Sequence, residues 1–310
     1  MNKKIILANP RGFCAGVDRA IAIVEKALNK YQAPIYVRHE VVHNKYVVDN
    51  LKERGAIFIE DLCDVPNGSI LVYSAHGVPL AVRQEAEQKN LKVIFDATCP
   101  LVSKVHIEIR NLHKDGYSII MIGHRGHPEV EGTMGQVAGN IFLIETKADI
   151  INLPIPNNTE KVAVVTQTTL SVDETKEIIV ALQQKFVNLR LPKNEDICYA
   201  TQNRQDAVKR IVKICDMLIV IGSKNSSNSN RLKELAENLG VRAYLIDFAS
   251  EINISWFLGV DRVGLTAGAS APEILVDRVI NRLKELDFKQ IEILESEQEK
   301  MVFALPKALR

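Results

Sequence analysis

Three of the five cysteines in this chain stand in similar surroundings. Each follows an apolar or acidic lead-in and precedes a run with helical periodicity, in the segments PRGFCAGVDRA (10–20), DATCPLVSKVH (96–106) and DICYATQNRQDA (196–207). The cysteines are odd in number and widely spaced, and no CxxC pair occurs, which argues against a disulfide framework, a zinc ribbon and a thioredoxin-type motif. Cys14, Cys99 and Cys198 are therefore core thiols, a catalytic thiol, or ligands that the fold brings together.

The elements that must position these cysteines repeat along the chain. Short apolar runs rich in β-branched residues alternate with amphipathic helical stretches, the pattern of an α/β protein with largely parallel sheets. From each of the three cysteines, the first polar loop follows after 28 or 29 residues, at His43, His127 and Ser226. Such a repeat predicts three similar α/β lobes in a pseudo-threefold arrangement. The expected strands are IILAN, PIYVRH, AIFIE, SILVYSA, KVIFDA, SIIMIGH, NIFLIE, KVAVVTQ, MLIVIGS, RAYLIDF, RVGLTAG and QIEILES.

The lobe boundaries follow from the same repeat. The first lobe spans residues 14–97, the second 98–196 and the third 197–310. The first two lobes each run into the next cysteine through a strand, KVIFDATC and LRLPKNEDIC, whereas the third ends in QIEILES without a cysteine. The N-terminal strand, within residues 1–13, has no unit of its own, so we expect it to join the third sheet and complete the third lobe.

Parallel sheets bind ligands beyond the carboxyl ends of their strands, and the polar loops of this chain follow strands at that edge. We therefore expect the cysteines and the loops to face one central cavity. A single cysteine is most often a small buried hydrophobe, which is our interpretation of Cys63 and Cys215. Three equivalent cysteines would instead supply three thiolates and leave a coordination position open. An iron–sulfur cluster with one non-cysteine site and a catalytic zinc ion both fit this pattern.

The polar loops carry groups that suit an anion. Histidines stand in RHEVVHN, SAHGV and GHRGHPE, and the third unit has hydroxyls and an amide in SKNSSNSN and GASAP. A lone histidine is more often structural, and Ser and Asn are favoured helix caps, each worth about 1 kcal/mol. Their gathering at one edge favours a phosphate site, with backbone N–H groups at a helix N-terminus as further donors. The candidates are His43, His76, His127, Ser226, Ser227, Asn228 and Ser270.

One carboxylate and one hydroxyl are candidates for proton transfer. Glu129, in HPEVEG, is the carboxylate nearest in sequence to the expected cavity, and Thr168 lies in the equivalent loop TQTTLS. A glutamate of this kind is usually solvated, and a threonine here could simply cap the helix around VDETKEII. In a dry pocket, however, desolvation would raise the pKa of Glu129 and make it a proton donor. Thr168 could then pass a proton or orient the ligand.

Composition and hydropathy narrow the choice of partner and compartment. The 39 basic and 38 acidic residues give a net charge of +1, so no bulk field would draw the protein to nucleic acid or to a membrane. The apolar run at the N-terminus is too short for a signal peptide, and no later stretch approaches the roughly 18 residues of a membrane span. We therefore expect a cytoplasmic protein that binds neither nucleic acid nor a membrane.

Nine motifs along essentially the whole chain together resemble the 4-hydroxy-3-methylbut-2-enyl diphosphate reductase family. They are PRGFCAGVDRA, RHEVVHN, SAHGV, DATCPLV, GHPEVEGTMGQ, TQTTLS, ICYATQNRQ, GSKNSSNSNRL and TAGASAP. The resemblance implies three lobes around one [4Fe-4S] cluster per chain, held by Cys14, Cys99 and Cys198, with the fourth iron open. It also implies that the seven candidates above bind the diphosphate, that Glu129 delivers a proton and that Thr168 assists.

The reaction implied by the resemblance is a reductive dehydroxylation. The allylic C4 hydroxyl of the substrate binds the open iron, two electrons arrive one at a time, and the C–O bond breaks as water leaves. Protonation at one of two carbons then gives isopentenyl or dimethylallyl diphosphate, the last step of the non-mevalonate isoprenoid pathway. No nucleotide-binding glycine fingerprint or flavin motif is evident, so the electrons should come from a separate protein such as ferredoxin or flavodoxin, as in the family.

Two other functions stay open on the residues alone. A zinc hydrolase could use three thiolates and a bound water, with Glu129 as the base. A non-catalytic iron–sulfur protein could sense diphosphate metabolites with the same cavity. Iron and acid-labile sulfide would distinguish a cluster from a zinc ion, and turnover would distinguish an enzyme from a sensor.

Overall fold

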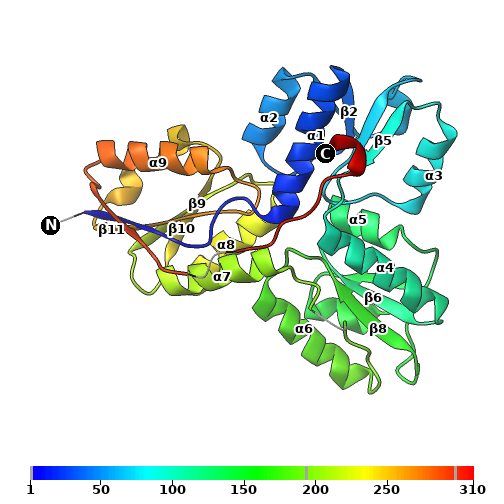
Figure 1. Ribbon diagram of the computed structural model, residues 1–310. Coiled ribbons are helices and arrows are strands. Elements are labelled where there is room, and N and C mark those ends of the chain that lie inside the picture. Colours follow the sequence, from blue (N-terminus) through cyan, green and yellow to red (C-terminus); the bar gives the residue numbers. More distant parts are fainter. Residues whose placement is uncertain (1–2, 193–194, 297–298) are drawn as a thin grey trace. The chain divides into compact units, whose positions relative to one another are not determined.

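The computed structural model describes residues 3–192, 195–296 and 299–310, and its strands form three parallel sheets (Figure 1). Each apolar run quoted above as a strand is confirmed, apart from the segment before Cys198 described below, and each pairing between these strands is parallel. The strands are β1 (Lys4–Leu7), β2 (Ile35–Arg38), β3 (Ala56–Ile59), β4 (Ile70–Tyr73), β5 (Val93–Asp96), β6 (Ser118–Ile122), β7 (Ile141–Ile144), β8 (Val162–Thr166), β9 (Met217–Ile221), β10 (Arg242–Ile246), β11 (Arg262–Ala267) and β12 (Gln290–Ile293).

Helices follow most of these strands, as the alternation predicts. The α-helices are α1 (Ala15–Tyr31), α2 (Lys45–Glu53), α3 (Leu80–Gln88), α4 (Pro100–Lys114), α5 (Pro128–Met134), α6 (Val172–Lys185), α7 (Tyr199–Ile211), α8 (Ser227–Asn238) and α9 (Glu273–Glu285). Short 3-10 helices include η1 (Leu62–Asp64) and η2 (Lys147–Asn152). None of the helices in the described part of the chain combines the length and the apolar character needed to cross a membrane.

The strand orders confirm the repeat. The three sheets are β3-β2-β4-β5, β7-β6-β8 and β10-β9-β11-β1-β12. In each, the first strand of the repeat lies between the second and the third. Strand β1 occupies the place beside β11 that β5 occupies beside β4, with Ile5 paired to Val263 on one side and to Ile291 on the other. The N-terminal strand therefore joins the third sheet, as expected.

The strand expected before Cys198 is reduced to one parallel bridge, between Arg190 and Ala163. Pro192 follows two residues later and has no backbone N–H to continue the ladder, which accounts for the short pairing. Residues 193–194 of the expected strand lie outside the described residues. The repeat is thus complete in the first and third sheets and truncated in the second.

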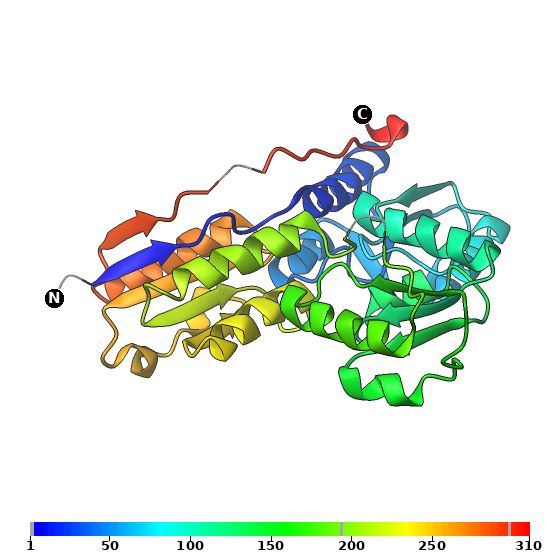
Figure 2. The same ribbon diagram turned by 90° about the horizontal axis from the view of Figure 1, so that it is seen from below.

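The chain divides into two compact units, and each is described by itself. Unit 1 comprises Met1–Asp18, His43–Asn50 and Tyr199–Val302; unit 2 comprises Arg19–Val42, Leu51–Cys198 and Phe303–Arg310. Within unit 2, Arg19 Nε donates to the Ala304 carbonyl (3.0 Å) and Lys30 Nζ to the Ala308 carbonyl (2.7 Å), and Figure 2 shows the C-terminal segment beside α1. The three lobe boundaries drawn from the sequence remain a prediction.

Helices cover both faces of the sheet in unit 1. Alternate residues of β1 point to opposite faces, as period two requires, so Ile5 and Leu7 pack with α9 while Ile6 packs with α7 and α8 (Figure 1). In unit 2, α4 and α5 cover one face of β7-β6-β8, and α6 with η2 covers the other. The central strands β1, β6, β8, β9 and β11 are almost wholly buried, so polar groups lie mainly at their ends and in the following loops.

Replacing Ile5 tests the insertion of β1 into its sheet. Ile5 is fully buried between α9 and the neighbouring strands, so Ile5→Ala should lower the free energy of unfolding by about 2–5 kcal/mol. Ile291, its partner on β12, is 43% exposed, and Ile291→Ala should change it by only about 0.5 kcal/mol. Urea denaturation monitored by circular dichroism would measure both. Equal effects would contradict the register of β1.

Candidate functional site

Each of the three repeated cysteines is held at a strand end by the same backbone hydrogen bond. The cysteine N–H donates to the carbonyl of the residue two positions beyond the last residue of β11, β4 or β8. The bonds run from Cys14 N to Ala269 O (3.2 Å), from Cys99 N to Ala75 O (2.9 Å) and from Cys198 N to Thr168 O (3.0 Å). The three cysteines are therefore structurally equivalent, each at the carboxyl edge of its own sheet.

Each of these cysteines also directly precedes a helix. Helix α1 begins at Ala15, α4 at Pro100 and α7 at Tyr199. A helix N-terminus favours a thiolate through its free N–H groups and its dipole. Burial raises the pKa of the Cys14 thiol, while the backbone N–H groups of Val17 and Gly16 and the nearby Arg204 cation act in the opposite direction.

All five cysteines are free thiols, so the expectation of no disulfide framework is met. Cys215 is buried, and burial raises the pKa of its thiol to about 11, as an inert core cysteine requires. Cys63 is exposed on the short η1 helix, so our interpretation of it as a buried thiol is wrong. On this one-turn helix Leu62 takes the buried position, and Cys63 stays at the surface with Asp64.

In unit 1, four of the predicted diphosphate ligands lie at the carboxyl edge of the third sheet. Ser226 caps α8, where its Oγ accepts from Ser229 N (3.3 Å). Asn228 lies in the first turn of α8, and its Oδ1 accepts from Ala269 N (2.8 Å). The carbonyl of the same Ala269 accepts from the Cys14 N–H. Ser270 Oγ donates to the His43 carbonyl (2.8 Å). Ser227 begins α8 and is half-buried.

Two glycines bring the loops of this edge together. Gly222 follows β9 and Gly268 follows β11, and the Ser229 hydroxyl fits between them. A Cβ at Gly222 would lie 2.1 Å from Ser229 Oγ, and one at Gly268 would lie 2.0 Å from it. Only glycine allows this approach, which sets the N-terminus of α8 against the loop that carries Ala269 and Ser270. The helix N-terminus thereby adds backbone donors beside the hydroxyl and amide groups.

In unit 2, the structure brings two predicted histidines together. The rings of His76 and His127 meet edge to face with their centroids 5.7 Å apart. His127 caps α5, where its Nδ1 accepts from Glu129 N (3.1 Å). That bond fixes the acceptor role of Nδ1, so in the neutral ring Nε2 carries the proton and can donate to an anion.

Glu129 and Thr168 form a buried pair at the same edge of unit 2. The Thr168 N–H donates to Glu129 Oε1 (2.6 Å), and Thr168 Oγ1 lies 3.0 Å from Oε2. Both side chains are only 4% exposed. Burial raises the pKa of Glu129 to about 7, although the two hydrogen bonds from Thr168 oppose the shift, and the carboxylate of Asp196 adds to it. A carboxyl group with this pKa can hold and release a proton near neutral pH.

Two buried charged residues were not singled out from the sequence. Asp196 precedes Cys198 by two positions, and its Oδ2 accepts from Thr166 N (3.1 Å). The sequence does hold a signal for Asp196, because an aspartate precedes Cys99 in DATC and Cys198 in DIC. Arg204 lies fully buried on α7, and its signal was its spacing with the apolar positions Ala200 and Ala207, which places it on the inner stripe of that helix.

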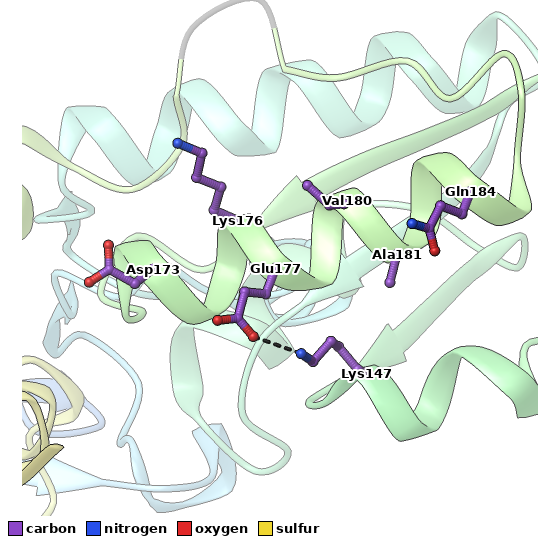
Figure 3. A pocket seen from close by; sticks show the side chains of 7 residues that line it. All are labelled: Lys147, Asp173, Lys176, Glu177, Val180, Ala181 and Gln184. Carbon is purple, nitrogen blue, oxygen red and sulfur yellow. Dashed lines mark hydrogen bonds and ion pairs between the residues drawn. The ribbon is translucent and has the colours of Figure 1, made fainter.

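A surface pocket of about 580 Å³ in unit 2 lies away from these groups. Figure 3 shows it along helix α6, where Lys147 Nζ and Glu177 Oε2 form an ion pair at 2.7 Å. It contains none of the predicted site residues, so the pocket is not the site that the sequence predicts. Its lining residues are Lys147, Asp173, Lys176, Glu177, Val180, Ala181 and Gln184.

The three cysteines fit the requirements of an iron–sulfur cluster in their own chemistry. They are free thiols at helix N-termini, and iron–sulfur clusters are held by thiolates. Among residues 3–192, 195–296 and 299–310, no three Cys, His, Asp or Glu side chains are grouped closely enough to hold one metal ion. A cluster places a different requirement on its ligands, because each cysteine binds a different iron atom.

Comparisons with known proteins agree with the motifs. A family model described as "LytB protein" matches residues 5–284. The chain is 62% identical to a 4-hydroxy-3-methylbut-2-enyl diphosphate reductase of Chromobacterium violaceum, over 100% of this chain and 99% of the relative, and 60% identical to one of a Polaromonas species, over 99% and 92%.

Two solved structures are also similar. One is the E-1-hydroxy-2-methyl-but-2-enyl-4-diphosphate reductase from Plasmodium falciparum, with a TM-score of 0.96 and 40% identity, covering 100% of this chain and 97% of that one. The other is described as (E)-4-hydroxy-3-methyl-but-2-enyl diphosphate reductase, the terminal enzyme of the non-mevalonate pathway. Its TM-score is 0.65 at 34% identity, covering 91% of this chain and 99% of that one.

Glu129 should make the stability of the metal-free protein fall as the pH rises. Its folded pKa of about 7 exceeds the value of 4.5 in an unfolded chain, so its contribution is complete below 4.5 and is lost as the pH passes through about 7. Relative to Glu129→Gln, the wild type should lose ~3 kcal/mol across this window. Urea unfolding at a series of pH values would measure the difference.

Glu131→Gln provides the matched control for this measurement. Glu131 lies on the same helix but is exposed, so its replacement should leave the pH dependence of the wild type nearly intact. If wild type and Glu129→Gln gave parallel curves of stability against pH, the raised pKa of Glu129 would be refuted.

Proposed function

Because this chain belongs to the LytB family, whose relatives are 4-hydroxy-3-methylbut-2-enyl diphosphate reductases, we propose that its three repeated cysteines, its buried Glu129–Thr168 pair and its polar loops serve that reaction. The protein is an oxidoreductase of the non-mevalonate pathway, and its substrate is a small allylic diphosphate. The reaction breaks the allylic C4–O bond, consumes two electrons and two protons, and releases water with isopentenyl or dimethylallyl diphosphate.

Cys14, Cys99 and Cys198 would hold one [4Fe-4S] cluster. When bound, such a cluster supplies electrons and, at an iron without a cysteine, a Lewis-acid site. What supports this assignment is the threefold hydrogen bond that gives the three cysteines equivalent places at helix N-termini. The other two cysteines have no such place, because Cys63 is exposed and Cys215 is packed in the core of unit 1.

The diphosphate would be bound by individual hydrogen-bond donors rather than by a bulk positive field, since the net charge is only +1. His76 and His127 present imidazoles from two loops of unit 2, and Ser226 with the N-terminus of α8 presents hydroxyl and backbone donors in unit 1. These groups suit several phosphate oxygens at once. The full set that we assign is His43, His76, His127, Ser226, Ser227, Asn228 and Ser270.

The observation that carries the mechanism is the buried pair of Glu129 and Thr168. With a pKa of about 7, Glu129 is partly protonated near neutral pH and can deliver a proton to the leaving hydroxyl. Thr168 Oγ1, 3.0 Å from Glu129 Oε2, can accept that proton and donate its own, or it can fix the orientation of the carboxyl group. Burial keeps bulk water from exchanging the proton before it is used.

The electrons would come from a ferredoxin or flavodoxin, and we place the protein in the cytoplasm. The five free thiols suit a reducing compartment. An anaerobic preparation tests the main assignment: it should be brown, contain iron and acid-labile sulfide, and convert the substrate with a strong chemical reductant. A colourless zinc protein, or a cluster that binds substrate without turnover, would contradict it.

Glu129→Gln should retain iron and sulfide but lose turnover. An amide cannot release the proton, so the rate should fall by roughly 10²- to 10⁴-fold. The rate is measured with reductant in excess, and exposed Glu131→Gln serves as the control on the same helix. Unchanged activity would remove Glu129 from the mechanism.

Cys99→Ser should lose or degrade the cluster, because an alkoxide is a poorer ligand for iron–sulfur centres than a thiolate. Cys63→Ser provides the matched control, since Cys63 is exposed and lies outside the repeat. Iron, sulfide and visible absorption would be compared after anaerobic purification. Equal retention of the cluster in both variants would contradict the assignment of Cys99.

A further inference from the structure

Arg204, in the middle of α7, is the largest fully buried side chain among the described residues. Its guanidinium donates from all three nitrogens. Nε and Nη2 reach the Gly12 carbonyl (3.0 and 2.7 Å), Nη2 also reaches the Phe13 carbonyl (3.1 Å), and Nη1 reaches the Ala200 carbonyl (2.9 Å). A buried cation is tolerated only when its donors are matched in this way.

Two of these backbone acceptors, Gly12 and Phe13, are the residues that directly precede Cys14. The same short segment is held from its other side by the third sheet, where Gly12 N donates to Ala267 O (3.1 Å) and Cys14 N to Ala269 O (3.2 Å). Gly12 has a φ of +69°, a conformation that glycine adopts without strain. Residues 12–14 therefore have one defined path, and Arg204 is the side chain that fixes it.

Glu299 completes this arrangement with a counter-charge. Its carboxylate accepts from Arg204 Nη1 (3.0 Å) and Nη2 (3.2 Å), and from Asn203 Nδ2 (2.9 Å). Both charges therefore lie against the backbone of the segment that leads into Cys14. Helix α7 itself begins directly after Cys198, so Arg204 links the helix that follows one repeated cysteine to the segment that precedes another.

We propose that Arg204 and Glu299 are a pair of positioning residues that fix the Cys14 segment and set the reduction potential of the cluster it helps to hold. The inference rests on the proposed function. Reduction adds negative charge at the cluster, so a fixed cation nearby favours it and a fixed anion opposes it. Arg204 acts through geometry and charge together, whereas Glu299 acts mainly through charge. Experiments can therefore separate the effects of the two residues.

Two conservative variants separate these effects in the anaerobically purified holoprotein. Glu299→Gln keeps the size of the side chain and removes the anion, so the midpoint potential of the cluster should shift to a more positive value. Arg204→Lys keeps the charge but loses the planar fork that reaches Gly12 and Phe13, so the cluster should be lost to an iron chelator several-fold faster, with a smaller shift in potential. Spectroscopically monitored redox titration and chelator kinetics measure the two quantities.

Glu285→Gln is the control, because Glu285 forms an exposed ion pair with Arg282 on α9 of the same unit and should alter neither quantity. Thermal unfolding after removal of the cluster shows whether a variant is simply destabilised. The inference is overturned if Glu299→Gln matches Glu285→Gln in potential, or if cluster loss in Arg204→Lys only follows a lower unfolding temperature. A wild-type chain without iron and sulfide would overturn the proposed function as well, whereas a normal wild-type cluster with unchanged variants would overturn this inference alone.

Discussion

The position of each repeated cysteine depends on one backbone hydrogen bond that occurs three times. At each of the three sheets, the carbonyl two residues past a strand accepts from the cysteine N–H, as between Ala75 and Cys99. Because the neighbouring strands are parallel, the other loops of that sheet end at the same edge. The sheets thus determine both where the thiol lies and which polar side chains accompany it. In the third sheet this requires β1 to stand beside β11, so the first strand of the chain completes the last sheet.

Two ionisable side chains, Glu129 and Arg204, are buried in this fold near the residues that we assign to the reaction. Glu129 accepts from both the N–H and the hydroxyl of Thr168, and yet its burial still raises its pKa to about 7. Desolvation outweighs two hydrogen bonds there, which keeps a proton available. Arg204 stays buried because backbone carbonyls and Glu299 satisfy its donors. Each group costs free energy to bury, and each lies beside residues that we assign to the reaction.

The sequence predicted the parallel strands, the repeat and the joining of β1 to the third sheet, because period, spacing and turn residues are local signals. It also predicted that Glu129 and Thr168 would share one edge, and the structure places them in contact. It did not predict the truncated strand before Cys198, where Pro192 removes a donor that the apolar pattern of LRL does not reveal. Cysteine is usually an interior residue, which led to the wrong prediction for Cys63; in its short helix Leu62 takes the buried position and Cys63 is exposed.

The burial of Asp196 and Arg204 could not be predicted from the sequence for a different reason. A charged residue in sequence looks solvated unless its partners are known, and those partners are distant: Thr166 lies 30 residues from Asp196, and Gly12 lies 192 residues from Arg204. The sequence also does not predict the packing of the C-terminal segment against α1, because Ala304 and Ala308 accept hydrogen bonds from α1 through their backbone carbonyls. Long-range backbone contacts of this kind leave no periodic signal in the chain.

The central claim is that Cys14, Cys99 and Cys198 hold a single cluster with one iron left for substrate. The most direct measurement is a crystal structure of the anaerobically purified protein, with data collected at the iron absorption edge. The account predicts one four-iron cluster per chain with these three sulfurs as its protein ligands. A single metal ion, or a cluster held by any other set of cysteines, would contradict it.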